Sequence, residues 1–180
     1  KKIRKAKETM EIYAPLADRM GMNIIRDELE DLSFSILNPD ARNLILDRLT
    51  FIKGKRDDII KNVYDELNKL LIQNKIEAEI TGREKTPFSI WRKMHSKRVS
   101  LEQLTDIVGF RVIVKNINDC YITLGVFHNE YSAIPGKFKD YISTPKINQY
   151  KSIHTSVIGP MKKRIEIQIR TKPMHEFAER

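Results

Sequence analysis

The chain has 180 residues, of which 41% are hydrophobic, as expected of a globular protein with a buried core. Bases exceed acids by 33 − 24 = 9, and residues 77–180 hold 18 of the bases but 11 of the acids, which predicts a nucleotide, nucleic acid or anionic lipid as partner. No window approaches 18 apolar residues, no signal peptide is visible, and the single Cys120 excludes an internal disulfide, so we expect a cytoplasmic protein without a transmembrane helix or structural zinc site.

The first part of the sequence predicts helices. Hydrophobic residues recur at helical spacing, and Pro15 is expected to interrupt the first helix. Asn38 as N-cap and Pro39 at the first helical position are typical of a helix start. A separate helix is expected after Gly54, where hydrophobic side chains again share one face. The expected helices cover residues 1–13, 23–37, 39 onward and 56–74.

Strands and helices are mixed from residue 77 onward. Alternating or continuous apolar runs predict strands at residues 76–82, 109–114, 152–159 and 164–169. Thr86 followed by Pro87 predicts a capped helix start. Further helices are expected over residues 117–131 and from residue 172. The sequence therefore predicts an α+β or α/β fold, with a mixed sheet flanked by helices behind an N-terminal helical segment.

Two carboxylates are candidates for chemistry. In "RIEIQIR" the isoleucines face one way, so Glu166 stands on a polar sheet face among basic neighbours. Asp106 lies just before the strand "GFRVIV". Taken singly, Glu166 fits an ordinary exposed strand and Asp106 an ordinary turn residue. As a pair on neighbouring strands they can hold Mg²⁺, and one of them can accept a proton from an attacking hydroxyl.

Basic residues gather in two places. In residues 82–98, Arg83 and Lys85 follow a strand, and Ser89 and Lys93 share one face of the next helix. A helix start beside cations suits a polyphosphate, although the glycine pattern of a P-loop is missing and a solvated lysine face is the simpler interpretation.

The second cluster surrounds Tyr150. Lysines flank this tyrosine, and His154 follows four residues later. An aromatic ring can stack on a nucleobase while nearby lysines hold its phosphates. A packing role for Tyr150 is the alternative, and a ring buried in the interior would count against base stacking. The flanking lysines are Lys137, Lys139, Lys146 and Lys151.

Four motifs in order give the chain a family resemblance. They resemble the synthetase domain of RelA/SpoT-type enzymes, which make guanosine tetra- and pentaphosphate. Residues 1–40 resemble the last helices of the hydrolase domain that precedes this synthetase in the long bifunctional members. We therefore expect a helical segment over residues 1–52 and a synthetase domain over residues 53–180. The motifs are "GREKTPFSIWRKM", "DIVGFRV", "PGKFKDYISTPKINQYKSIHTSV" and "IEIQIRTKPMHEFAE".

The resemblance implies a nucleotidyltransferase-like fold and Mg²⁺-dependent transfer of pyrophosphate from ATP to the 3′-hydroxyl of GDP or GTP. By the same resemblance Arg83 stacks on adenine, Asp106 is a Mg²⁺ ligand, Glu166 is the metal-assisting carboxylate and the base, and Tyr150 stacks on guanine. The ATP phosphates would be held by Lys85, Ser89 and Lys93, and the acceptor nucleotide by Lys137, Lys139, Lys146, Asn148, His154 and Gln168.

Some positions depart from the family pattern. Lys137 replaces an arginine. Gln149 replaces the glycine before the stacking tyrosine, which is expected either to stiffen that loop or to exclude a positive φ there. Two other functions stay open: a non-catalytic remnant that binds guanine nucleotides, and an RNA-binding module, for which no paired aromatic motif is evident. Contact with the ribosome would occur only through a larger parent protein, and no membrane partner is expected.

Overall fold

The computed structural model describes all 180 residues, which form two compact units. Unit 1 consists of residues Lys1–Lys55, Lys85–Thr105 and Ala178–Arg180. Unit 2 consists of residues Arg56–Glu84 and Asp106–Phe177. These units are defined by packing, whereas the expected boundary between residues 52 and 53 concerns resemblance to other proteins, so that boundary stays a prediction.

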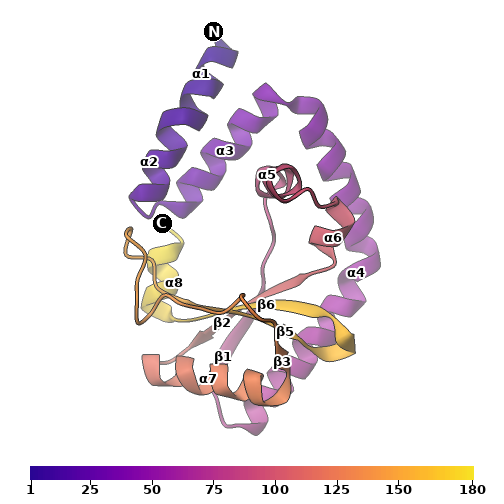
Figure 1. The fold of residues 1–180 in the computed structure, drawn as a ribbon, viewed down its shortest axis with the longest axis vertical. Helices are drawn as coiled ribbons and strands as arrows, with labels where there is room; N and C mark the ends of the chain where they lie inside the picture. The colour runs from indigo at the N-terminus through magenta and orange to yellow at the C-terminus, as the bar shows by residue number, and fades with distance from the viewer. The chain divides into compact units, whose positions relative to one another are not determined.

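The N-terminal helices of unit 1 run on through Pro15 without the expected interruption (Figure 1). Pro15 lies in the first turn of α2, and the turn before it widens to a π-helix in which the Ala14 amide donates to the carbonyl of Thr9. A proline near a helix start loses no hydrogen bond, and the wider turn accommodates it. The elements are α1 (Lys2–Glu8), η1 (Thr9–Tyr13), α2 (Ala14–Arg19) and α3 (Asn23–Leu37).

One long helix, α4 (Pro39–Gln73), replaces the two helices that were expected. It begins at Pro39 as predicted and continues through Gly54, where the sequence suggested a break. A helical glycine costs only about 1 kcal/mol relative to alanine, which packing on both sides of the position can offset. Ile45 packs in the core of unit 1, and Leu67 packs in the core of unit 2.

The core of unit 1 is small and aromatic. Helix α5 (Pro87–Lys97) starts as predicted, with the Thr86 hydroxyl oxygen accepting from the Ser89 amide at 3.2 Å. The rings of Phe34 in α3 and Trp91 in α5 lie 5.4 Å apart, and Phe88 joins them at 5.5 Å from Phe34. Helix α6 (Leu101–Thr105) adds buried leucines to this cluster.

Unit 2 is built on a mixed sheet in the order β1-β2-β6-β5-β3, with β4 also paired to β5 (Figure 1). The β2–β6 pair is parallel and every other pair is antiparallel. This arrangement confirms the predicted mixed sheet flanked by helices. The strands are β1 (Ala78–Gly82), β2 (Val108–Val114), β3 (Ser132–Ala133), β4 (Lys139–Asp140), β5 (Ile153–Ile158) and β6 (Arg164–Thr171).

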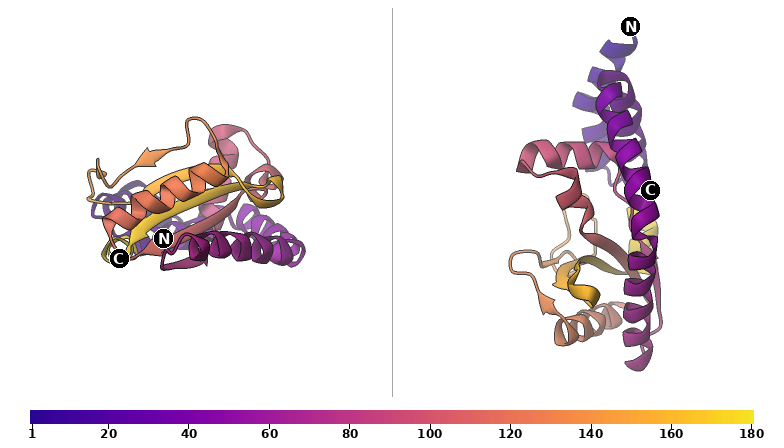
Figure 2. Two further views of the ribbon diagram at one scale, coloured as in Figure 1. Left: turned by 90° about the horizontal axis from the view of Figure 1, so that it is seen from below. Right: turned by 90° about the vertical axis from the view of Figure 1, so that its right-hand side faces the viewer.

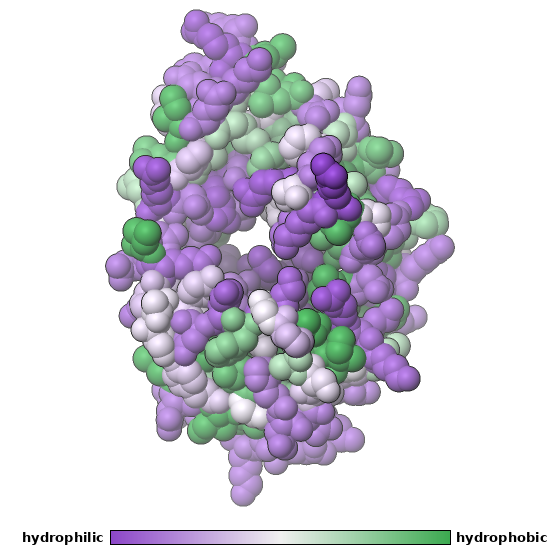
Figure 3. Space-filling model, viewed as in Figure 1, coloured by the Kyte–Doolittle hydropathy of each residue, from purple (hydrophilic) through white to green (hydrophobic).

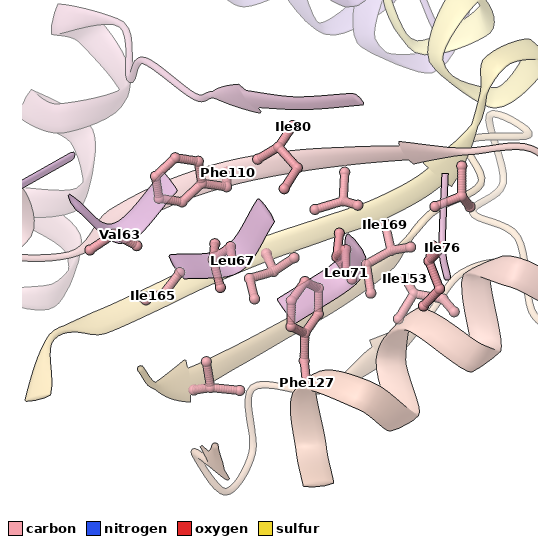
Figure 4. Close-up of a cluster of buried hydrophobic side chains, with 14 of the residues drawn as sticks. Val63, Leu67, Leu71, Ile76, Ile80, Phe110, Phe127, Ile153, Ile165 and Ile169 are labelled. Carbon is pink, nitrogen blue, oxygen red and sulfur yellow. The ribbon is translucent and has the colours of Figure 1, made fainter. Parts of the chain in front are cut away.

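One face of this sheet is the hydrophobic core of unit 2. The three isoleucines of β6 are buried on it, as their alternation predicted. Val63, Leu67 and Leu71 of α4 pack against this face together with Phe127 of α7 (Ile117–Glu130), as Figure 4 shows. Figure 2 shows α7 lying along the sheet, and α8 (Lys172–Ala178) follows β6. The opposite face is therefore left for polar residues.

Hydrophobic side chains also remain on the surface of the N-terminal helices, among the charged ones (Figure 3). Ile12, Leu16 and Met20 are about half exposed or more. None of the helices combines the length and apolarity that crossing a bilayer requires.

Candidate functional site

The polar face of the sheet brings four of the predicted site residues together. Across three strands, Lys139 of β4 pairs with His154 of β5, and His154 pairs with Gln168 of β6. Glu166 lies two residues before Gln168 on the same strand and therefore on the same face. These residues come from separate parts of the chain, and the sheet register alone sets them side by side.

Arg83 reaches Glu166 across a strand that has no side chain at this level. Its amide donates to the Gly109 carbonyl at 2.8 Å, and Gly109 is the β2 partner of Glu166. The Arg83 guanidinium Nη1 lies 3.9 Å from the Glu166 carboxylate Oε2. A Cβ added at Gly109 would lie 3.4 Å from the Arg83 Cβ, an ordinary van der Waals contact, so the arginine packs directly over the glycine. The structure thus places a cation beside the predicted base.

Asp106 lies just before β2 and is accompanied by cations of its own. Its carboxylate Oδ1 is 3.4 Å from Lys163 Nζ. Burial lowers the pKa of Arg56, while the negative charge of Asp106 acts in the opposite direction. Asp106 precedes Gly109, the partner of Glu166, by three residues, which is roughly 10 Å along the strands. Asp106 lies before the first residue of β2, so the strand register does not fix its side chain on the face of Glu166, and a shared metal ion stays a prediction.

The donor set suits an ion that brings ligands with it. No group of three or more His, Cys, Asp or Glu side chains is arranged to hold a metal. Mg²⁺ typically takes one or two carboxylates and completes its coordination with water and substrate phosphates. Asp106 and Glu166, both accessible to solvent, fit that pattern. They do not fit a closed structural metal site.

Tyr150 does not present the open ring that the sequence suggested. The residue is only 8% exposed, and its hydroxyl shares a 2.8 Å hydrogen bond with His154 Nε2. The Lys146 ammonium lies 5.0 Å from the centroid of the Tyr150 ring and 4.9 Å from that of Tyr141. Burial of the ring supports the packing alternative, and stacking of guanine on Tyr150 stays a prediction. The ring of Tyr150 is covered by aromatic neighbours and by Lys146, whose ammonium is attracted to the face of the ring. Tyr150 is not a member of either hydrophobic core cluster.

The His154 side chain is neutral at physiological pH. Burial above all, together with the positive charges of Lys146, Arg83 and Arg170, lowers its pKa to about 4. A neutral imidazole can share a hydrogen bond with Tyr150 but cannot act as a cation toward phosphate. His154 therefore orders the aromatic cluster, while the lysines carry the charge.

The loop before Tyr150 is closed by its own backbone. The Lys146 amide donates to the Tyr150 carbonyl at 3.1 Å, and the Gln149 amide donates to the Lys146 carbonyl at 2.8 Å. Gln149 has φ of 68°, so the expectation that it would exclude a positive φ is wrong. The Asn148 side-chain oxygen accepts from the Tyr150 amide at 3.1 Å and shapes the same turn. Lys137 lies outside this closed turn and is exposed.

The remaining predicted phosphate ligands belong to unit 1. Lys85 Nζ donates to the Leu104 carbonyl at 3.2 Å. Ser89 lies in the capped first turn of α5, and Lys93 follows one turn later on the same face. The aromatic packing of Phe88 and Trp91 on Phe34 fixes the orientation of α5 within unit 1.

Residues 82–180 match the family model described as "Region found in RelA / SpoT proteins", which is more than half of the chain. The chain belongs to the RelA/SpoT family. Among curated relatives, GTP pyrophosphokinase rsh of Brucella melitensis is 51% identical over 99% of this chain and 24% of its own length. A GTP pyrophosphokinase of Streptomyces coelicolor is 46% identical over 99% of this chain and 21% of its own length. The chain thus spans about a quarter of the length of these relatives.

Solved structures similar to this RelA/SpoT chain agree with its fold. Small alarmone synthetase 1 of Bacillus subtilis matches with a TM-score of 0.56 and 25% identity, over 72% of this chain and 74% of that one. Small alarmone synthetase 2 of the same organism matches with a TM-score of 0.53 and 31% identity, over 69% and 75% of the two chains. The mixed sheet with flanking helices is therefore the nucleotidyltransferase-like fold that the resemblance implied.

Several residues of this RelA/SpoT chain reach the site without having been singled out in the sequence. Lys163 and Arg56 lie near Asp106, and Tyr141 joins the Tyr150 cluster. Arg111 pairs with Gln168 on the polar face. Arg111 could have been found from its alternation with Gly109 in β2, but the others depend on contacts between segments distant in sequence.

Proposed function

We propose that this chain is the synthetase part of an alarmone-producing enzyme that transfers pyrophosphate from ATP to the 3′-hydroxyl of GDP or GTP in the cytoplasm. The observation that carries the proposal is Glu166, a carboxylate on a polar sheet face with Arg83 at 3.9 Å and with Gln168, His154 and Lys139 on the same face. The relatives at 51% and 46% identity are named GTP pyrophosphokinases, which supports the same reaction.

The family resemblance assigns Arg83 of unit 2 to the adenine of the donor nucleotide, and Lys85, Ser89 and Lys93 of unit 1 to its phosphates. Arg83 offers a flat guanidinium for the adenine, and Lys85, Ser89 and Lys93 offer point charges and a hydroxyl for the phosphates. The start of α5 adds backbone amides and a favourable dipole. These groups position the β-phosphate without taking part in bond breaking.

The acceptor nucleotide would bind at the Tyr150 cluster. Guanine stacking requires Lys146 to leave the position over the ring, and the ammonium would then be free to pair with an acceptor oxygen. Lys137 and Lys139 supply charge for the acceptor phosphates. Asn148 and Gln168 supply amides that can recognise the nucleotide by hydrogen bonding.

Glu166 would act as the base. Its carboxylate takes the proton of the 3′-hydroxyl, the hydroxyl oxygen bonds to the β-phosphorus of ATP, and the bond from that phosphorus to the bridging α,β-oxygen breaks, releasing AMP. Mg²⁺, held by Asp106 and Glu166, would neutralise phosphate charge. The cations around both carboxylates let two polyanions come together, so positioning and charge neutralisation provide most of the rate enhancement.

Product analysis tests this function directly. The purified chain is incubated with γ-labelled ATP, GDP and Mg²⁺, and the nucleotides are separated by thin-layer chromatography. We expect label in guanosine tetraphosphate, and about a 10³-fold slower reaction for Glu166→Gln. Glu79→Gln, which removes an exposed carboxylate from β1, is the matched control and should react at the parent rate.

Two other results would replace the proposal. GDP binding without labelled product would identify a non-catalytic guanine-nucleotide-binding protein. RNA binding that weakens steeply with salt and survives Asp106→Asn, again without product, would identify an RNA-binding module.

A further inference from the structure

Both carboxylates assigned to the metal are paired with cations of the chain itself. Lys163 Nζ lies 3.4 Å from Asp106 Oδ1, and Arg83 Nη1 lies 3.9 Å from Glu166 Oε2. The side chain of Lys163 is 30% exposed, and that of Asp106 is 66% exposed. An incoming divalent cation therefore meets carboxylates whose charge is already balanced.

The backbone holds Lys163 in this place from both sides. The parallel β2–β6 ladder begins at the pair Val108 and Ile165, and Asp106 and Lys163 each lie two residues before these partners, just outside the strands. On its other side, Lys163 closes the turn after β5: its carbonyl accepts from the Gly159 amide at 2.9 Å. The start of the ladder thus brings the two segments that carry Lys163 and Asp106 side by side, and the side chains complete the 3.4 Å contact.

The turn that delivers Lys163 is strained. Met161 and Lys162 have φ values of 60° and 57°, a conformation that costs a residue with a side chain roughly 1–2 kcal/mol. Strain of this kind persists where the surrounding structure over-determines it, and it concentrates at functional sites. A turn retained at this cost is more consistent with a functional position for Lys163 than with an arbitrary surface loop.

We propose that Lys163 is a positioning residue that competes with the divalent cation for Asp106 and yields only when nucleotide phosphate offers its ammonium another partner. This inference rests on the proposed function, because it takes Asp106 as a metal ligand. A single ammonium and a divalent ion repel each other at one carboxylate, so each weakens the binding of the other. The phosphate oxygens of a bound nucleotide remove the conflict by attracting both cations. Lys163 therefore makes the site select a metal–nucleotide complex over the free metal.

Direct metal binding tests the proposal without an activity assay. Mn²⁺ is titrated into the full chain, and unbound Mn²⁺ is measured by electron paramagnetic resonance. We expect Lys163→Met to bind free Mn²⁺ about tenfold more tightly than the parent, because the competing charge is gone. Lys162→Met removes the same charge from the next, exposed residue and should stay within about twofold of the parent.

The same titration with a non-hydrolysable ATP analogue gives the second half of the test. The analogue should strengthen Mn²⁺ binding about tenfold less in Lys163→Met than in the parent, since the parent alone must release a lysine. Lys163→Arg keeps the ion pair and should behave as the parent. If Lys163→Met does not fold, Lys163→Gln also lacks the charge and gives the same comparison.

Two results would overturn the proposal. One is equal affinity of Lys163→Met and Lys162→Met for free Mn²⁺. The other is a gain in affinity that persists when Asp106→Asn is added to Lys163→Met, because the metal would then bind elsewhere. The readout also separates the two proposals. Labelled product with no change in Mn²⁺ binding removes the role of Lys163 alone, and the expected Mn²⁺ pattern without product removes the proposed function alone.

Discussion

The two halves of helix α4 lie in different environments. In residues 56–73 the helix presents Val63, Leu67 and Leu71 to the core of unit 2, and all three are fully buried. In residues 39–55 it contributes one buried hydrophobic residue, Ile45, to the core of unit 1, while other hydrophobic side chains stay exposed. One continuous helix thus serves a large core and a small one.

This difference shows how the two units are stabilised. Sixteen buried residues form the core cluster of unit 2, whereas five form that of unit 1. Buried apolar area therefore holds the carboxylates of unit 2 in place, whereas helix α5 of unit 1, which carries proposed phosphate ligands, depends on a few aromatic contacts and on its cap. We expect substitutions in the two units to affect different properties.

The largest effect should come from the core of unit 2. Leu67→Ala should lower the free energy of unfolding by about 3–5 kcal/mol, because a fully buried leucine leaves a cavity. Leu44→Ala changes the same residue type on the same helix at a position that is 67% exposed, and should stay within about 0.5 kcal/mol. Urea unfolding measures both. Equal losses would show that the two halves of α4 do not differ as described.

The second largest effect should be a loss of catalytic efficiency caused by a substitution in helix α5 of unit 1. Lys93→Met should reduce kcat/KM for ATP about 100-fold, since it removes a charge that we propose to bind the ATP phosphates. Lys97→Met, one turn further along α5, is the control and should change kcat/KM less than threefold. Steady-state kinetics with varied ATP give both values, and unfolding curves should remain close to the parent. Comparable losses in the two variants would indicate a general charge effect of the helix.

A pH dependence should belong to unit 2. The pKa of His154 is about 4 in the folded chain against 6.5 for an unperturbed histidine, so the unfolded chain binds more protons between these values. The contribution of neutral His154 to the free energy of unfolding is therefore fully present above about pH 6.5 and is lost as the pH falls toward 4. At pH 5 the free energy of unfolding should be lower by ~2 kcal/mol. Urea unfolding at pH 7 and pH 5 should show a smaller loss for His154→Gln than for the parent. Parallel losses would mean that His154 is not held neutral.

The smallest effect should come from the loop beside Tyr150. Gln149→Gly should raise the free energy of unfolding by about 0.5–1 kcal/mol, because glycine adopts φ of 68° without strain although it is more flexible when unfolded. Lys151→Gly, in the same loop without a positive φ, should be neutral or destabilising. Thermal unfolding measures both changes. A lower Tm for Gln149→Gly would contradict the inference that the positive φ of Gln149 is strained.

Local patterns predicted much of the fold. The isoleucine alternation in β6 identified both the core face and the exposed side of Glu166, and Thr86 marked the start of α5 correctly. The failures came where packing outweighs local preference. Gly54 does not end a helix that is packed on both sides of it, and Gln149 keeps a positive φ because its backbone closes a turn.

The candidate site was predicted in its residue types and less well in its contacts. Glu166, Gln168, His154 and Lys139 meet on one face, as a strand pattern and a shared family suggest. The cover over Tyr150 and the pairing of Lys163 with Asp106 were missed. Both depend on which strands pair and on contacts between loops distant in sequence. The alternation of apolar and polar residues within a single strand carries no information on either.

The proposed base and the proposed acceptor site lie on strands of very different length. Glu166 lies on the eight-residue strand β6 in the middle of the sheet, whereas the loop that carries Tyr150 follows the two-residue strand β4 at the margin of the sheet. Amide protons near Glu166 should exchange with solvent only when unit 2 unfolds globally, and those near Lys139 should exchange through local fraying. Under the proposed assignment, the acceptor side of the site would therefore be its more mobile part and the strand of Glu166 its more rigid part.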